Sequence, residues 1–333
     1  MRLIPLSKYR MGCAAGALVF AVISLAGPQA GGATAAVPQL RVALIAPSAR
    51  NDHAFTQSMY AALTSLKHGS HFKLTVSENQ FVVEEAAQLM RTYAADGYSL
   101  IVVHGSQYGD ALREIAREYP KVSFAWGTSS TTLGLPNVYA YSAASNQGGY
   151  VQGYLAALVS KSKVIGEIGP VDVGDAKLYL DGFRAGALAA VPNAVVHAGY
   201  TGSFSDPSLM AKRADEYVKA RADVLTGSSQ AVVGAIAVCE DRDVAWFGTQ
   251  WSQTALAPTQ VVSSQVYDWT VVLKRILSRV RAGRLGGATY TITLKNGGEK
   301  IEFNPQYKLP AAVRAASQER ISAIENGTVH VPR

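Results

Sequence analysis

Short and long apolar segments alternate along the chain from about residue 40 onward. The short segments, such as 40–46 and 72–76, are rich in β-branched and aromatic residues, a composition typical of buried strands. The longer segments, such as 55–68, place apolar residues three or four positions apart, as on one face of a helix. Because each parallel strand needs a crossover connection to the next, this alternation predicts an α/β fold with helices on both faces of parallel sheets.

The strand and helix series occurs twice, which predicts two lobes of similar plan with a central cleft between them. We expect a hinge through residues 142–145 and 248–263, where the two series exchange. The predicted division of the chain is a signal peptide at 1–36, an N-terminal lobe at 37–142 with 264–285 returning to it, a C-terminal lobe at 143–263, and a C-terminal tail at 286–333 with a hairpin and a helix.

The first residues have the pattern of a secretory leader. Three basic residues precede an uncharged apolar run at 11–27, and small residues follow it, so we expect a signal peptide cleaved near Ala35 or Ala36. An uncleaved anchor is the alternative, but the run is shorter than the roughly 20 residues of a membrane-spanning helix. Cys13 lies at the start of the apolar run rather than after it and is badly placed for acylation, so we expect an exported periplasmic or extracellular protein that is not a lipoprotein.

Charge and cysteine content exclude several classes of protein. The formal net charge is +7 and falls to +4 without the leader, which is too mild to indicate nucleic-acid binding. Cys239 is the single cysteine after the leader, so no internal disulfide is expected, and it is interpreted as a small buried hydrophobe. The pair His68 and His71 lacks further evident ligands, and neither a metal site nor a cofactor is predicted.

The chain lacks the motifs of the common nucleotide-dependent and hydrolytic enzymes. No glycine lies between Leu44 and Asp52, so the dinucleotide fingerprint after the first strand is absent. Neither a phosphate-binding P-loop nor a nucleophile elbow occurs. Without a nucleophile paired with a base, the sequence favours binding over catalysis.

Polar and aromatic residues follow the predicted strands and should converge on the cleft. Asp52 and Asp206 are also well placed to cap the helices that they precede, and Phe55 shares a helix face with core residues. The candidate ligand-binding residues at strand ends are Asn51, Asp52, Phe55, Gly105, Ser106, Trp126, Phe204, Asp206, Gly227, Gln250 and Trp251.

Phe204 is the least easily explained of these residues by packing alone. It lies among glycine and serine residues at 202–205, in a loop without apolar periodicity. If Phe55 and Phe204 come from opposite lobes, closure would place a flat ligand between the two rings, each stacking contact contributing about 0.5–1.5 kcal/mol beyond area burial.

Four segments, at 51–63, 182–196, 202–206 and 222–236, resemble the basic membrane protein family of extracytoplasmic solute-binding proteins, whose best-described members are purine nucleoside receptors. The resemblance extends from about residue 40 to about residue 285. It implies a type I periplasmic-binding-protein fold, a membrane permease of an ABC transporter as partner, and stacking of the rings of Phe55 and Phe204 on the two faces of a purine.

The chain departs from the family pattern at positions that hold a sugar. Gln250 and Ser252 stand where the family has acids, with Trp251 between them. Tyr267, a further candidate ligand-binding residue, replaces a common lysine. Gln147 replaces a glutamate at a helix start. Because hydrogen bonds to charged groups contribute about 1.5–3 kcal/mol each, we expect a less polar or sugar-free heterocycle such as a nucleobase, with a ribonucleoside as the alternative.

The sequence therefore predicts a monomeric, non-enzymatic solute-binding protein that captures a planar heterocycle and delivers it to a permease. A ligand-sensing receptor of the same fold is an alternative, and an exported nucleoside hydrolase is a weaker one. The leader in place of a helix-turn-helix segment argues against a transcription regulator of similar fold.

Overall fold

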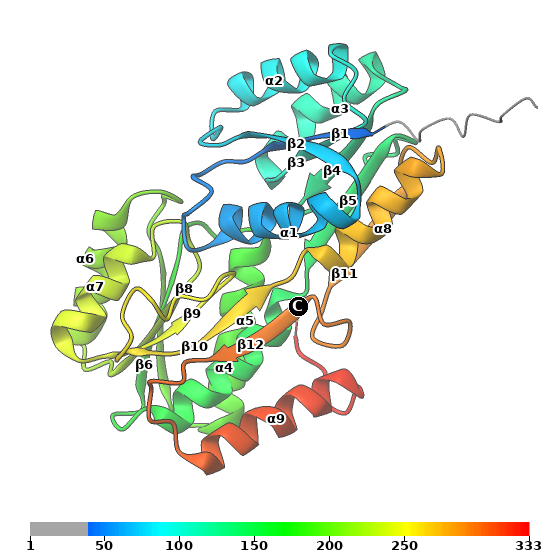
Figure 1. The fold of residues 1–333 in the computed structure, drawn as a ribbon. Helices are drawn as coiled ribbons and strands as arrows, with labels where there is room; N and C mark the ends of the chain where they lie inside the picture. The colour runs from blue at the N-terminus through cyan, green and yellow to red at the C-terminus, as the bar shows by residue number, and fades with distance from the viewer. Residues whose placement is uncertain (1–38, 333) are drawn as a thin grey trace, which may run out of the picture. The chain divides into compact units, whose positions relative to one another are not determined.

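A computed structural model describes residues 39–332, which contain two six-stranded sheets (Figure 1). The first sheet has the strand order β11-β5-β4-β3-β1-β2, and every pairing in it is parallel. Its strands are β1 (Leu40–Ile45), β2 (Phe72–Ser77), β3 (Leu100–Val103), β4 (Ser123–Gly127), β5 (Val138–Ala143) and β11 (Ala288–Ile292). We call this sheet and the helices packed on it the N-lobe.

Helices cover both faces of the N-lobe sheet, as the alternation of segments predicted. One face packs against α1 (Phe55–Gly69) and α8 (Thr270–Arg281), and the other against α2 (Val83–Ala95) and α3 (Gly109–Glu118), which the short helix η1 (Ser106–Tyr108) precedes. Successive residues of β1 point to opposite faces, so that Val42 and Leu44 lie in one core and Ala43 and Ile45 in the other.

The second sheet has the order β12-β10-β9-β8-β6-β7, and β12 pairs antiparallel with β10. Its strands are β6 (Val164–Gly169), β7 (Val195–Tyr200), β8 (Val224–Gly227), β9 (Ala245–Gly248), β10 (Val261–Tyr267) and β12 (Glu299–Phe303). One face packs against α4 (Ser145–Val159), α5 (Gly174–Ala190) and α9 (Ala311–Glu325), and the other against α6 (Pro207–Lys219) and α7 (Val233–Arg242). These elements form the C-lobe.

The chain passes between the two sheets three times. The first passage lies at Ala144, between β5 and α4, and falls within the predicted hinge segment 142–145. The second lies at residues 268–269, between β10 and α8, and the third at residues 293–298, between β11 and β12.

The predicted second hinge segment, 248–263, is wrong, because β9 and β10 are parallel neighbours in one sheet. The loop between them connects two strands of the C-lobe sheet, and one of its side chains contacts the N-lobe. In that loop the buried Gln253 donates from Nε2 to the backbone oxygen of His53, at 3.2 Å. The boundary predicted at residue 263 therefore lies too early, since β10 continues to Tyr267.

The predicted hairpin in the C-terminal tail is also wrong. β11 pairs with β5 and β12 pairs with β10, so the two strands belong to different sheets. A strand–turn–strand pattern in the sequence is the same whether the strands pair with each other or with the open edges of two sheets. Here β11 pairs with the open edge of the N-lobe sheet, and β12 pairs with the open edge of the C-lobe sheet.

The signal peptide, the cleavage site near Ala35 or Ala36 and the position of Cys13 lie outside the described residues. Within residues 39–332, none of the helices combines the length and the apolar character needed to cross a membrane.

Candidate functional site

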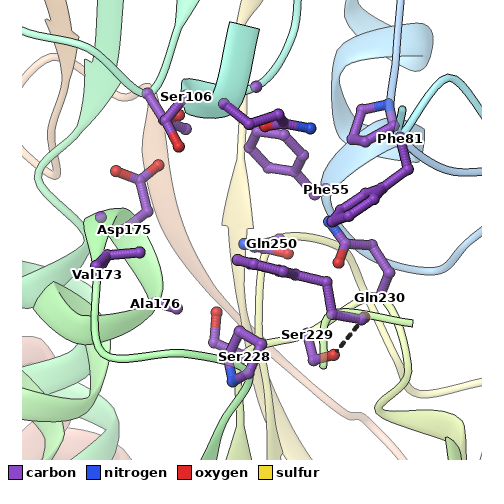
Figure 2. A pocket seen from close by; sticks show the side chains of 17 residues that line it. Phe55, Phe81, Ser106, Val173, Asp175, Ala176, Ser228, Ser229, Gln230 and Gln250 are labelled. Carbon is purple, nitrogen blue, oxygen red and sulfur yellow. Dashed lines mark hydrogen bonds between the residues drawn. The ribbon is translucent and has the colours of Figure 1, made fainter. Parts of the chain in front are cut away.

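A pocket with a volume of about 320 Å³ lies between the two lobes, at the low end of the range for small-molecule sites. Its lining residues follow the carboxyl ends of β1 to β4 in the N-lobe and of β6 to β9 in the C-lobe, where a ligand site is expected in α/β folds. They are Pro47, Phe55, Phe81, Gly105, Ser106, Gln107, Thr128, Pro170, Val173, Gly174, Asp175, Ala176, Phe204, Ser228, Ser229, Gln230 and Gln250. Figure 2 shows side chains of both lobes around this space.

Phe55 forms a fixed wall of the pocket on the N-lobe side. The residue is only 6% exposed, and its ring stacks on the imidazole of His104 with a centroid distance of 3.7 Å and an interplanar angle of 9°. Because His104 covers one face of the Phe55 ring, only the remaining surface of the ring is available to contact a ligand in the pocket.

His104 is held in one neutral tautomer behind this ring. Its Nε2 donates to the backbone oxygen of Phe55 at 3.2 Å, and its Nδ1 accepts from the Tyr141 hydroxyl at 2.8 Å, because a carbonyl can only accept. Burial lowers the pKa of His104 to about 3, so the imidazole carries no charge near neutral pH.

Asp52 positions Phe55 without facing the pocket. Its Oδ1 accepts from the backbone N–H groups of Ala54 and Gln57, at 2.9 and 3.0 Å. Its Oδ2 accepts from the N–H of Thr56 at 3.0 Å and from the hydroxyl of Ser48 at 2.6 Å. Both carboxylate oxygens are thus used to fix the first turn of α1, so the capping interpretation describes this residue.

Phe204 lines the same pocket from the C-lobe and contacts a second ring at its edge. The ring of Phe81, in the loop after β2, lies 5.9 Å from that of Phe204 at an angle of 48°. Phe204 is partly exposed and Phe81 is 48% exposed, and the Ser229 hydroxyl donates to the Phe204 carbonyl at 2.7 Å. The Phe204 ring therefore rests on a loop and a partly exposed neighbour, without a buried ring behind it.

Asp206 caps α6, next to the loop that carries Phe204. Its Oδ1 accepts from the backbone N–H groups of Ser208 and Leu209, at 2.8 and 3.3 Å, and from the Ser208 hydroxyl at 2.6 Å. These hydrogen bonds, the one from the Ser208 side chain first, lower the pKa of Asp206. Asp206 does not line the pocket.

Two polar side chains from the C-lobe present unpaired oxygens in the pocket lining. Asp175, in the first turn of α5, is 8% exposed, and its Oδ2 has no hydrogen-bond partner among residues 39–332. Gln250 is similarly buried, with an unpartnered Oε1, and its backbone has a φ of 68°, a conformation that non-glycine residues rarely adopt. Figure 2 shows the Asp175 carboxyl group on the same side of the pocket as Ser106.

Two predicted residues, Trp126 and Gly227, lie behind the pocket rather than in its lining. Trp126 is buried, and its Nε1 donates to the backbone oxygen of Gly105 at 3.0 Å, which holds one lining segment in place. Gly105 cannot carry a side chain without displacing Tyr108, because an added Cβ would lie 2.8 Å from that ring. Gly227 ends β8, where its carbonyl accepts from the Thr249 hydroxyl at 2.9 Å.

The other predicted residues are further from the lining. Asn51 is exposed, and neither it nor Trp251 lines the pocket. Tyr267 is buried in the N-lobe core, where its ring packs against Trp269 with a centroid distance of 5.3 Å. The lining thus includes five predicted residues, Phe55, Gly105, Ser106, Phe204 and Gln250.

Phe81 and Asp175 are two lining residues that the sequence analysis missed. Both follow a strand, Phe81 after β2 and Asp175 after β6, so the carboxyl-end rule that selected the other candidates applies to them too. Each lies close to the start of a helix. From the sequence alone, an aromatic or acidic residue at such a position is readily interpreted as a structural residue of that helix rather than as a pocket residue.

The described residues contain no group of three or more His, Cys, Asp or Glu side chains arranged to hold a metal ion. Cys239 is buried in α7, and burial raises the pKa of its thiol far above the usual value. The position agrees with its interpretation as a small core residue.

Comparisons with known proteins show the family and the fold of the chain. Residues 39–331 match the family model "ABC transporter substrate-binding protein PnrA-like". The chain is 26% identical to a purine-binding protein of Brucella abortus (strain 2308) over 93% of its own length and 87% of that protein. It is also 26% identical to the ABC transporter nucleoside-binding protein BmpA of Lactococcus lactis subsp. cremoris (strain MG1363), over 85% and 86% of the two chains.

A solved structure of a solute-binding protein of an ABC transporter system from Conexibacter woesei DSM 14684 has the same fold. It superposes with a TM-score of 0.74 at 24% identity and covers 88% of this chain and 98% of that one. The fold is that of type I periplasmic binding proteins, as predicted. With the family model matched from residue 39 to residue 331, the chain belongs to the Bmp family of non-catalytic ABC transporter solute-binding proteins.

Proposed function

We propose that the protein captures a purine nucleobase or nucleoside outside the cytoplasm and delivers it to the permease of an ABC transporter. The observation that carries the proposal is that Phe55 and Phe204, from opposite lobes, line one pocket. Two relatives named for purine and nucleoside binding support the same class of ligand.

The pocket offers what a planar ring needs. Aromatic side chains provide flat apolar surfaces, and stacking on each adds about 0.5–1.5 kcal/mol beyond the burial of apolar area. Asp175, Gln250 and Ser228 add polar atoms from the C-lobe side that would orient the ring by hydrogen bonds. Ser252 donates to Glu302 at 2.7 Å and lies outside the lining, so it is not available to hold a sugar.

Delivery requires the ligand to favour a closed arrangement of the lobes. A solute contacting Phe55 and Phe204 at once binds the closed arrangement more tightly than an open one, and that difference in affinity is what shifts the equilibrium. The three passages of the chain between the sheets are the segments around which closure would occur. We propose that the protein acts as an exported monomer, with a leader cleaved near Ala35 or Ala36.

Isothermal titration calorimetry of the protein, unfolded to remove bound ligand and then refolded, tests the proposal. We expect saturable binding of purine bases or nucleosides with a negative heat-capacity change from the burial of apolar surface. Binding of free sugars or amino acids without binding of any heterocycle would overturn it.

A further inference from the structure

The pocket lining contains one ionisable side chain. Among the described lining residues Asp175 is the sole acid, and none is a lysine, arginine or histidine. A phosphate or carboxylate group on a ligand would therefore meet no positive charge here and would be repelled by Asp175. The ligand is uncharged or cationic at the point where it contacts this residue.

Within residues 39–332, no group donates a hydrogen bond to the Asp175 carboxyl group. Its Oδ2 is buried without a partner, while its backbone oxygen accepts from the Ser145 hydroxyl at 2.9 Å. Burial alone raises the pKa of Asp175 to about 7, because neither a hydrogen-bond donor nor a cation offsets the loss of hydration. An unpaired buried carboxyl group is costly and requires a partner.

The titratable groups around Asp175 on other elements are also not cationic. Burial raises the pKa of Tyr141 in β5, of Tyr267 in β10 and of Glu299 in β12, and the negative charge of an ionised Asp175 raises each of them further. Glu299 accepts from the side chain of Gln265 and from the backbone N–H of Gly148. The missing donors for Asp175 therefore come from the ligand rather than from these neighbours.

We propose that Asp175 determines specificity by accepting hydrogen bonds from two adjacent N–H groups of the bound ring, so that the pocket selects a guanine-type edge. This inference rests on the proposed function, because it assigns the ligand of that same pocket. A carboxylate has two oxygens side by side and is matched by a ring N–H next to an amino group. Two N–H donors from the ligand would favour the ionised form that accepts both bonds, against the burial that raises the pKa of Asp175 in the free protein.

The other purine edges satisfy this carboxylate less well. A hypoxanthine-type edge offers one N–H beside a carbonyl oxygen, which would face the second carboxylate oxygen. An adenine-type edge offers an amino group beside an acceptor nitrogen, which pairs with the protonated acid instead. The ionised carboxylate thus distinguishes the guanine-type edge from the other two, whereas the protonated acid pairs with either donor–acceptor edge.

Calorimetry of the full chain with guanosine, inosine and adenosine, and with the corresponding bases, tests the assignment. We expect guanine-type ligands to bind at least about tenfold more tightly than the other two classes. In Asp175→Asn the amide presents one donor and one acceptor, so affinity for the guanine type should fall about 10- to 100-fold, and the adenine and hypoxanthine types, which offer one donor and one acceptor, should both be preferred to it.

Asp172→Asn is the matched control. Asp172 lies three residues earlier in the same loop, is exposed, and contacts Tyr200 and Lys177 outside the pocket lining. Its substitution removes the same charge and should leave the order of affinities unchanged. A change of order in this control would show that the loop charge, and not the pocket carboxyl group, determines selectivity.

The pH dependence of binding tests the same inference without a substitution. A ligand that binds the ionised carboxylate lowers the pKa of Asp175 in the complex. Affinity for guanosine should therefore rise as pH increases from 5 towards 7, by up to about tenfold per unit, and level off above about 7. In Asp175→Asn this slope should disappear.

The outcomes separate the two proposals. If purines bind but their order and pH dependence do not change in Asp175→Asn, the assignment of Asp175 is wrong and the proposed function stands. A preference for adenosine that weakens as pH rises would show that Asp175 binds as the protonated acid, which also overturns the inference. If none of the six compounds binds, the proposed function itself fails.

Discussion

Phe55 and Phe204 contribute the same ring to the same pocket, but the protein supports them differently. Phe55 begins α1, is 6% exposed, and stacks on the buried His104, which is itself held by hydrogen bonds. Phe204 lies in the loop between β7 and α6 and contacts Phe81, a ring that is 48% exposed. One ring is fixed by the core, and the other lies on the surface of its lobe.

The difference indicates that the N-lobe supplies a rigid aromatic surface and the C-lobe a more adaptable one. A ring held by buried neighbours keeps its orientation without ligand, which lowers the entropy cost of binding. A ring on a loop adjusts to the ligand and to closure, and it loses rotational freedom only when both lobes contact the solute. If this contrast is correct, equivalent substitutions at the two rings should affect stability and affinity to different extents.

Phe55→Ala should have the largest effect on both quantities. Loss of a buried ring that packs on His104 should lower the free energy of unfolding by about 3 kcal/mol, and loss of the stacking surface should weaken purine binding about 100-fold. Urea unfolding and calorimetry measure the two changes. Phe55→Leu is the control, since it restores apolar volume but not the ring and should recover stability more than affinity. A change in affinity below threefold would break the comparison.

The support behind Phe55 should be sensitive to pH. The pKa of His104 is about 3 in the folded protein and 6.5 as the ordinary value, so the unfolded chain binds the proton first. Stability from the neutral imidazole is complete above pH 6.5 and declines as pH falls towards 3. Between pH 8 and pH 5 the protein should lose about 2 kcal/mol relative to His104→Asn.

The comparison with His104→Asn is needed because buried acids act in the opposite direction. Burial raises the pKa of Asp175 and of Glu167 to about 7 and that of Glu299 well above its usual value, so these three groups favour the folded state as pH falls. All three are present in the protein and in the variant, and their contribution cancels in the difference. Equal pH profiles for the two proteins would show that His104 is not a buried neutral support.

Phe204→Ala should weaken binding at least tenfold while changing the free energy of unfolding by no more than about 0.5 kcal/mol. The ring is partly exposed and fills no core, so its loss costs little in the free protein. Calorimetry and thermal unfolding measure the two effects, and Phe204→Tyr, which keeps the ring, should bind nearly as well as the original protein. Unchanged affinity in Phe204→Ala would return this residue to a structural role.

Phe81→Ala should have the smallest effect, a two- to fivefold loss of affinity by calorimetry, because Phe81 acts by contact with Phe204. In the double variant Phe81→Ala, Phe204→Ala the losses should not add, since the second ring has no role once the first is gone. Strictly additive losses would mean that Phe81 contacts the ligand independently.

Much of the fold follows from patterns that are local in the chain. The strand and helix segments, and the two-lobe α/β plan, depend on periodicities that a few neighbouring residues establish. Strand partners are not local. The residues of β11 and β12 have the pattern of a hairpin, and nothing within them indicates that the open edges of two different sheets are their partners.

The sequence predicted those pocket residues that could be selected because they follow the carboxyl end of a strand. Phe55, Ser106, Phe204 and Gln250 follow strands and line the pocket, whereas Trp126 and Tyr267 point into cores beside it. The sequence indicates where a strand ends, but it does not indicate whether the aromatic side chain at that end points into the pocket or into a core. Asp175 was missed for a related reason, because an acid in a first helical turn is typical of any helix.

The passages of the chain between the lobes have a consequence for biosynthesis. The N-lobe sheet is incomplete without β11, whose last residue is Ile292, and the C-lobe sheet is incomplete without β12, which ends at Phe303. Neither half can therefore mature while the ribosome still holds the last quarter of the polypeptide. Such dependence on distant partners slows folding, because each sheet is completed only by pairing between strands that lie far apart in the chain.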